Sequence, residues 1–360
     1  MKSFSIVISV AVAVNIAYHH HVVTAYEVDD AHHPDDLHSH DHHYFDSDYE
    51  DIQNHHHYHH HMDHDMQDHT DHDHRGLRLH ETPTPMDIGN HTYASKYDFI
   101  RSGHRCGSRK PSRKKVKESN DRLSKWMTDE KHRMDQTTNI VIPTYFHVIT
   151  SGKTGTISNS TLKNQLQVLN DLYKTYGFSF RLVKTTRTNN RSWYYATIGS
   201  TAETNMFKKL RVGGASTLNV YFNDASGNLG YAALPMYYDD KPVQDGVVVL
   251  SGSVPGGSVT YYNEGKTLVH EVGHWLGLLH TFDTNHISRN GCLGNGDFVS
   301  DTPRQRYPTM GCPVRQDSCP NSGGLDMVSN FMDYSDDVCL TKFTTGQKNR
   351  MHAMWDTYRA

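Results

Sequence analysis

The sequence of 360 residues is poor in apolar side chains and contains one long apolar run, near its start. Hydrophobic residues make up 36% and the mean hydropathy is −0.71, which is low for a chain that folds along its whole length. The run from Phe4 to Ala17 follows Lys2 and precedes Val23-Thr24-Ala25, the pattern of a signal peptide at residues 1–25. It is too short to span a bilayer comfortably, and no second run follows. We therefore expect a secreted, extracellular protein with no membrane partner.

Lys and Arg are absent from residues 27–73, which are rich in His and Asp. The His/Asp-rich segment, residues 26–80, includes His55-His56-His57-Tyr58-His59-His60-His61 and cannot bury enough apolar surface to fold. We therefore expect a disordered N-terminal pro-region. Weak binding of zinc or copper is one interpretation of this segment, and a solubilising spacer is the other.

Cysteine is scarce, and the count of five is odd. Cys292, Cys312, Cys319 and Cys339 cluster in a stretch rich in Gly, Pro, Asp and Asn, where a small core favours disulfides. Four cysteines allow three pairings, and the sequence alone does not choose among them. Cys106 stands alone far upstream, so it is a free thiol, an intermolecularly paired thiol or a metal ligand.

The pattern with the most specific chemical meaning is His270-Glu271-x-x-His274-x-x-Gly277-x-x-His280. On a helix, His270 and His274 lie on one face one turn apart, a spacing that suits two ligands of a tetrahedral zinc. Gly277 can take a positive φ and end the helix, so that the chain turns back and brings in His280 as the third ligand. Glu271 is then placed to act as a general base. A chance match on an ordinary amphipathic helix is the alternative, and the added Gly277 and His280 argue against it.

A pro-segment at residues 81–136 combines the lone cysteine with a basic run. The positive charge of Arg105 favours the thiolate of Cys106, which could then fill the open position on the zinc and keep an enzyme latent. The basic run at residues 109–117 is either a solvated segment or an accessible cleavage site. Because the run is short and lacks interleaved aromatic residues, we expect no nucleic-acid partner.

The folded domain is expected at residues 137–360, with strands alternating with helices ahead of the zinc motif. Residues 230–235 are typical of an edge strand that an extended peptide could join, or of a plain connector. The expected strands lie at 140–149, 178–183, 218–222 and 247–250, and the expected helices at 121–134, 161–176, 201–210 and 344–358.

Three further features leave alternatives open. Asp297, Asp301 and Thr302 could hold calcium through hard oxygen atoms or form a solvated turn. Asp336 and Asp337 could favour Lys or Arg in a substrate, or lie in a solvated loop. Sequons for N-linked glycans begin at Asn90, Asn159 and Asn190.

With Asn330-Phe331-Met332-Asp333-Tyr334 added to the zinc motif, residues 140–359 resemble the metzincin zinc metallopeptidases of the pappalysin family, specifically its ulilysin-like secreted members. The segments at 296–303, 311–313 and 317–320 carry the same resemblance. It implies an α/β (α+β) metzincin-like zincin. An upper mixed sheet would hold the zinc helix, and a lower irregular subdomain would be held by disulfides.

The resemblance also implies roles for individual residues. Met332 would form an apolar floor beneath the metal, Tyr334 would stabilise the oxyanion, and Arg105-Cys106-Gly107 is similar to a cysteine switch. The implied disulfides are Cys292–Cys319 and Cys312–Cys339, and calcium is implied near Asp297 and Thr302.

The predicted function is a secreted zinc-dependent endopeptidase made as a latent zymogen. Its partners would be protein or peptide substrates and an activating protease that cuts the pro-segment. The alternatives are a secreted His-rich metal-binding protein with an idle peptidase domain, and a structural zinc domain used for adhesion. The presence of Glu271 and all three histidines argues against the idle domain, and the open fourth position argues against the structural one.

Overall fold

The structure, a computed structural model, describes residues 84–89, 91–129, 139–283 and 292–360. The predicted signal peptide at 1–25, the His/Asp-rich segment at 26–80 and the sequon residue Asn90 lie outside these ranges. Among the described residues, no helix is long and apolar enough to cross a membrane.

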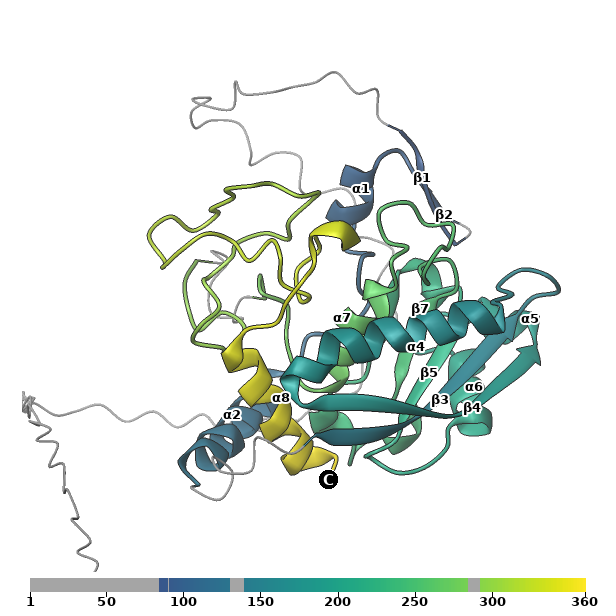
Figure 1. The fold of residues 1–360 in the computed structure, drawn as a ribbon, viewed down its shortest axis with the longest axis horizontal. Coiled ribbons are helices and arrows are strands. Elements are labelled where there is room, and N and C mark those ends of the chain that lie inside the picture. Colours follow the sequence, from purple (N-terminus) through teal and green to yellow (C-terminus); the bar gives the residue numbers. More distant parts are fainter. Residues whose placement is uncertain (1–83, 90, 130–138, 284–291) are drawn as a thin grey trace, which may run out of the picture. The chain divides into compact units, whose positions relative to one another are not determined.

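A five-stranded mixed sheet carries the first half of the catalytic domain, as the sequence predicts (Figure 1). Four neighbouring strands run parallel, and the edge strand beside them is antiparallel. The central strands are buried along their whole length, which explains why they consist of near-continuous apolar runs. The strands, in their order across the sheet, are β4 (Phe178–Asn189), β3 (Ile140–Thr150), β5 (Leu218–Asn223), β7 (Val247–Leu250) and β6 (Gly230–Ala232).

Two helices pack together against this sheet. Helix α4 (Asn159–Tyr173) begins after Ser158, whose hydroxyl accepts a hydrogen bond from the Thr161 N–H, and it packs on β4. Helix α7 (Lys266–Trp275) is buried on all sides, between β6, β7 and α4. It carries the zinc motif, so the motif is held rigidly inside the core.

Shorter elements complete the catalytic domain. Helix α6 (Thr201–Leu210) has the bounds expected from the sequence, because Ser200 caps it and the chain extends at Arg211. Helix α5 (Arg191–Tyr194) precedes it. Single 3₁₀ turns lie at η1 (Lys174–Tyr176), η2 (Ala225–Gly227), η3 (Pro235–Tyr237), η4 (Pro242–Gln244) and η5 (Asp337–Cys339).

The described part of the pro-segment is folded. It forms a two-stranded ribbon and two helices: β1 (Met86–Ile88), β2 (His91–Tyr93), α1 (Lys96–Arg101) and α2 (Arg113–Thr128). The basic run at 109–117, which the sequence leaves open between a solvated segment and a cleavage site, enters helix α2 at Arg113. Ser112 accepts from the Lys115 N–H and caps α2, and Lys117 pairs with Asp121 four residues on.

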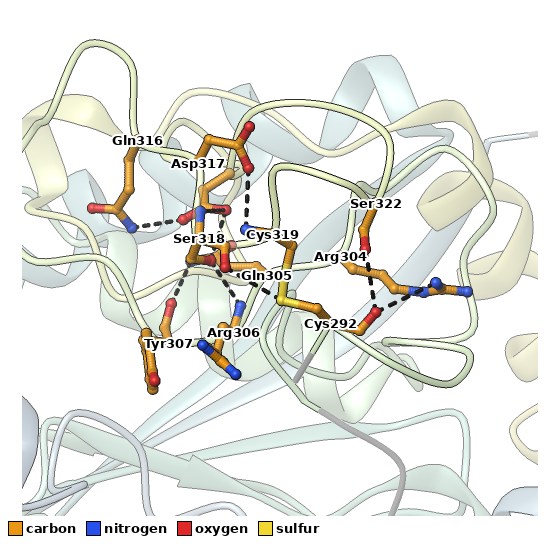
Figure 2. The surroundings of a disulfide bond; sticks show 11 residues. Cys292, Arg304, Gln305, Arg306, Tyr307, Gln316, Asp317, Ser318, Cys319 and Ser322 are labelled. Atoms are coloured by element: carbon orange, nitrogen blue, oxygen red, sulfur yellow. Dashed lines mark hydrogen bonds between the residues drawn. A yellow bond between two sulfur atoms is a disulfide. The ribbon is translucent and has the colours of Figure 1, made fainter. Parts of the chain in front are cut away.

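The chain after α7 has no regular helix or strand among the described residues, apart from η5, until the closing helix α8 (Thr345–Tyr358), which begins with a capping box at Thr344. The structure joins Cys292 to Cys319 and Cys312 to Cys339. Figure 2 shows the surroundings of the first disulfide. There the Cys292 carbonyl accepts hydrogen bonds from Arg304 and Ser322, and Ser318 accepts one from the Arg306 N–H. Such local bonds replace the regular ladders that this part of the chain lacks.

Candidate metal centre and catalytic site

Helix α7 and the turn after it bring three histidines together. His270 and His274 lie one turn apart, and the helix ends at Trp275. Gly277 then takes φ +93°, in the left-handed region, and a Cβ there would also lie 2.5 Å from Met354. The turn returns the chain so that the possible ligand atoms of His270, His274, His280 and Cys106 all lie within 4.8 Å of one another.

Hydrogen bonds to the outer ring nitrogens set the orientation of the three imidazoles. The Nδ1 atoms of His270 and His274 lie 2.6 Å and 2.8 Å from the carbonyl oxygens of Phe331 and Leu278. His280 Nδ1 lies 3.2 Å from Asp283 Oδ2. Because a carbonyl or carboxylate oxygen only accepts, each ring donates through Nδ1 and presents the lone pair of Nε2 to the interior.

The inward nitrogens fit a metal ion. His274 Nε2 and His280 Nε2 lie 3.0 Å apart, and His270 Nε2 is buried without a hydrogen-bond partner. Burial, together with the neighbouring histidines, lowers the pKa of His270 well below its usual value and that of His274 to about 3. Neutral imidazoles with converging lone pairs are the donor set of a zinc site.

Glu271 lies beside these nitrogens and is fully buried. Its Oε2 accepts a hydrogen bond of 3.1 Å from the Ser108 hydroxyl and one of 3.5 Å from Cys106 Sγ. Burial raises the pKa of Glu271 to about 8, against the opposing effect of Arg105. A side chain at Gly230 would clash with Glu271, with its Cβ 2.7 Å from Cγ, so the edge strand needs glycine here. No motif or spacing in the sequence indicates this contact between Gly230 and Glu271.

The structure places Cys106 at the site but corrects the expected direction of its pKa. Burial and the Glu271 carboxylate raise the pKa of Cys106 well above its usual value. The Arg105 guanidinium lies over the ring of Tyr262, 4.9 Å from its centroid. A divalent cation at the imidazole nitrogens would favour the thiolate instead.

The pro-segment lies along the edge strand β6, where the sequence indicated that an extended peptide could join. The Gly107 N–H donates to the Gly230 carbonyl at 2.9 Å, and the Leu229 N–H donates to the His104 carbonyl at 3.2 Å. The Ala232 N–H donates to the Ser108 hydroxyl at 2.8 Å. The edge that would bind an extended peptide is therefore covered in this form of the protein.

Met332 and Tyr334 also border the three histidines. The sulfur of Met332 fills the space where a side chain at Gly273 of α7 would stand, 2.5 Å from an ideal Cβ. The ring of Tyr334 lies with its centroid 5.9 Å from that of His270 and 5.0 Å from that of His280. Both residues follow Phe331, whose carbonyl holds His270, so this one turn borders the whole centre.

Asp297 and Thr302 contact each other, whereas Asp301 does not join them. Asp297 Oδ1 accepts from the Thr302 hydroxyl at 2.6 Å, and its Oδ2 is buried without a hydrogen-bond partner. Burial raises the pKa of Asp297 to about 7. Asp301 instead caps α8 through Thr344 and Gly346. Within the described ranges, the group of Cys106 and the three histidines is the one set of three or more possible ligands.

Asp336 and Asp337, whose role the sequence does not settle, both form contacts within the folded protein. Asp336 pairs with Lys96 of the pro-segment at 2.8 Å. Asp337 accepts from the N–H groups of Glu264 and Lys266 at the start of α7. Neither lies in a solvated loop, since both are buried.

Comparison with known proteins agrees with this site. Residues 211–356 match the peptidase M43 family described as pregnancy-associated plasma protein-A. An extracellular metalloprotease of Trichophyton verrucosum is 45% identical over 259 residues, which cover 71% of this chain and 91% of that protein. An extracellular metalloprotease 1 of Coccidioides posadasii is 49% identical over 228 residues, covering 61% and 79%.

Two solved structures have a similar fold. A Tannerella forsythia promirolysin mutant superposes with a TM-score of 0.59 at 25% identity, covering 71% of this chain and 94% of that one. Mature mirolysin in complex with a cleaved peptide has a TM-score of 0.53 at 29% identity, covering 61% and 93%. The fold and the histidine cluster together define a metallopeptidase with a metzincin-like fold. The chain belongs to the M43, or pappalysin, family of extracellular metalloproteases.

Proposed function

We propose that this chain is the zymogen of a secreted zinc endopeptidase whose metal is held by His270, His274 and His280. The observation that carries the proposal is the convergence of the three imidazole Nε2 atoms beside the buried side chain of Glu271. Zinc at that point supplies a Lewis acid that polarises a peptide carbonyl.

Three residues of this chain have separate roles in the reaction. Glu271 takes a proton from the attacking water and returns it to the leaving amine, a transfer worth roughly 10²–10⁴ in rate. Tyr334, whose ring lies beside those of His270 and His280, donates a hydrogen bond to the oxyanion. Met332 packs under α7 and fixes the floor of the site.

The substrate is an extended protein or peptide segment that pairs with β6. The pro-segment already uses the N–H and carbonyl groups of this strand, which supports the edge as a binding surface for backbone. The cleaved peptide bound to mature mirolysin supports the same substrate class.

Latency is proposed to depend on Cys106, which occupies the fourth position at the metal until the pro-segment is cut. Its buried sulfur lies within 4.8 Å of the imidazole nitrogens. Arg109 and Lys110 are exposed and lie between Cys106 and the first turn of α2, so an activating protease would cut there. The similarity to promirolysin supports a zymogen.

A calcium ion is a second, separate proposal for Asp297 and Thr302. The unpaired buried oxygen of Asp297 supports it, since buried carboxylates otherwise find a donor or a cation. Calcium should raise the melting temperature of the wild type and leave that of Asp297→Asn unchanged. An equal response of both proteins would exclude this site.

The decisive experiment follows cleavage of a denatured protein mixture by the secreted, zinc-loaded chain before and after limited trypsin treatment. Chelator-sensitive activity that rises when the chain is nicked near Arg109 supports both the peptidase and its latency. Activity without nicking retains the peptidase and removes Cys106 as a switch. No activity in a folded, nicked and zinc-loaded sample would favour the His-rich metal-binding alternative.

The matched variant is Glu271→Ala. Hydrolysis by the nicked chain should fall at least roughly 10²-fold while bound zinc, measured by atomic absorption, stays at one equivalent. Activity that survives this change would refute Glu271 as the general base.

A further inference from the structure

We propose that Asp283 is a positioning residue for the metal centre, which holds His280 in the ring orientation and tautomer needed for zinc. The proposal rests on the proposed function, in which His280 is a zinc ligand. Asp283 lies outside the H-E-x-x-H-x-x-G-x-x-H pattern, three residues after its last histidine.

The geometry links one carboxylate oxygen to both ends of His280. Asp283 Oδ2 accepts from the His280 backbone N–H at 3.1 Å and lies 3.2 Å from its Nδ1. The Asp283 N–H donates back to the His280 carbonyl at 2.9 Å, which closes a tight turn. Asp283 is itself buried, with 7% of its surface exposed, so water does not compete for these bonds.

His280 depends more on its hydrogen bond to Asp283 than the other two histidines depend on theirs. His270 and His274 stand on a rigid helix and donate to backbone carbonyls. His280 stands on a turn after α7, where stacking of Phe282 at 4.8 Å and the bond to Asp283 set the ring. A carboxylate partner also makes an imidazole a stronger donor to a metal, and loss of such a partner typically costs 10–100-fold in affinity.

The second carboxylate oxygen of Asp283 contacts the pro-segment, so a second role for Asp283 must be tested separately. Asp283 Oδ1 pairs with Lys110 of the pro-segment at 3.2 Å, and Lys110 is largely exposed. Asp283 could thus act by anchoring the pro-segment or by orienting His280. Lys110→Met removes only the first contact and serves as the matched control.

The experiment measures zinc affinity of the full chain by competition with a chromophoric chelator. Asp283→Ala should weaken zinc binding roughly 10–100-fold. Asp283→Asn, whose amide oxygen still accepts from Nδ1, should lose less, and Lys110→Met should match the wild type. Melting curves of the zinc-free proteins identify any variant that fails to fold; Asp283→Asn is the conservative substitute if Asp283→Ala does.

Wild-type affinity in folded Asp283→Ala, or an equal loss in Lys110→Met, would overturn the proposal. His280→Ala separates this outcome from failure of the proposed function. If zinc affinity is also unchanged in His280→Ala, the ligand assignment fails; if it falls only there, Asp283 alone is excluded.

Discussion

At the scale of single residues, the site depends on contacts that no spacing pattern encodes. The histidine spacing predicts a zinc helix because a helix converts a four-residue separation into one face. Ser108 lies in the pro-segment and Asp283 lies in a turn. In such irregular segments the spacing of residues does not predict where a side chain points, so the sequence does not reveal their contacts with Glu271 and His280. Gly230 belongs to the same class, since its role is to leave room for Glu271.

Ser108 provides the first prediction at this scale. Its hydroxyl donates to Glu271 and accepts from the Ala232 N–H, so Ser108→Ala removes two hydrogen bonds, each worth about 0.5–1.5 kcal/mol, from the latent form. The uncut variant should hydrolyse a quenched peptide roughly 10-fold faster than the uncut wild type, since 1.4 kcal/mol corresponds to a factor of about ten. Ser124→Ala, on the outer face of α2, is the control. Equal basal rates in all three proteins would remove Ser108 from latency.

Asp337 provides a second prediction, on stability. Burial raises the pKa of Asp337 to about 6 from an ordinary 3.8, with Arg105 opposing the shift. A raised folded-state pKa means that the contribution to stability is complete below the ordinary pKa and is lost as the pH rises through about 6. The loss corresponds to about 3 kcal/mol.

Asp337→Asn should remove that loss. In urea unfolding from about pH 4 to about pH 7, the variant should gain stability relative to the wild type as the pH rises. A difference between Asp337→Asn and the wild type that is constant with pH would contradict the buried carboxyl.

At the scale of elements, the sequence predicts the sheet and the buried helices well and the pro-segment poorly. Continuous apolar runs indicate β5 and β7, and a serine cap with apolar spacing gives α6 its bounds. The helix expected at 121–134 matches only the second half of α2, which begins earlier, at Arg113, and is stabilised by residues of α8. Trp126 Nε1 donates to Asp356 at 2.8 Å, a contact between residues 230 apart in the sequence.

The two disulfides offer a matched element-scale prediction. Each joins cysteines 27 residues apart, so removing either should cost about 3–4 kcal/mol by loop entropy. At about 2–4 °C per kcal/mol, either double serine variant should melt roughly 10 °C lower. Only the loop closed by Cys312–Cys339 contains Met332 and Tyr334.

Because only one disulfide loop contains Met332 and Tyr334, the two variants should differ in kcat although both lose stability. At a temperature where both nicked variants are folded, Cys312→Ser/Cys339→Ser should also lower kcat, whereas Cys292→Ser/Cys319→Ser should not. An unchanged kcat in Cys312→Ser/Cys339→Ser would mean that the Met332 turn does not depend on its disulfide.

At the scale of the whole described domain, the pro-segment contacts the catalytic domain on both sides of Arg109 and Lys110, and Lys96 of α1 also pairs with Asp336. Residues 104–108 cover β6 and the metal centre, and α2 packs on α8, where Arg350 donates to Asn120 at 3.1 Å (Figure 1). A cut at Arg109 or Lys110 falls between these two contacts. It would release the part that blocks catalysis and leave α2 covalently joined to the catalytic domain.

Trp126→Ala tests this division. Trp126 is 7% exposed, and truncating a buried tryptophan costs about 3–5 kcal/mol, or roughly 6–20 °C in melting temperature. If α2 stays in place after activation, the zymogen and the nicked, active enzyme should both lose this amount, as followed by calorimetry. A loss confined to the zymogen would mean that α2 departs with the rest of the pro-segment. The active enzyme would then begin after α2, and its α8 surface would be exposed.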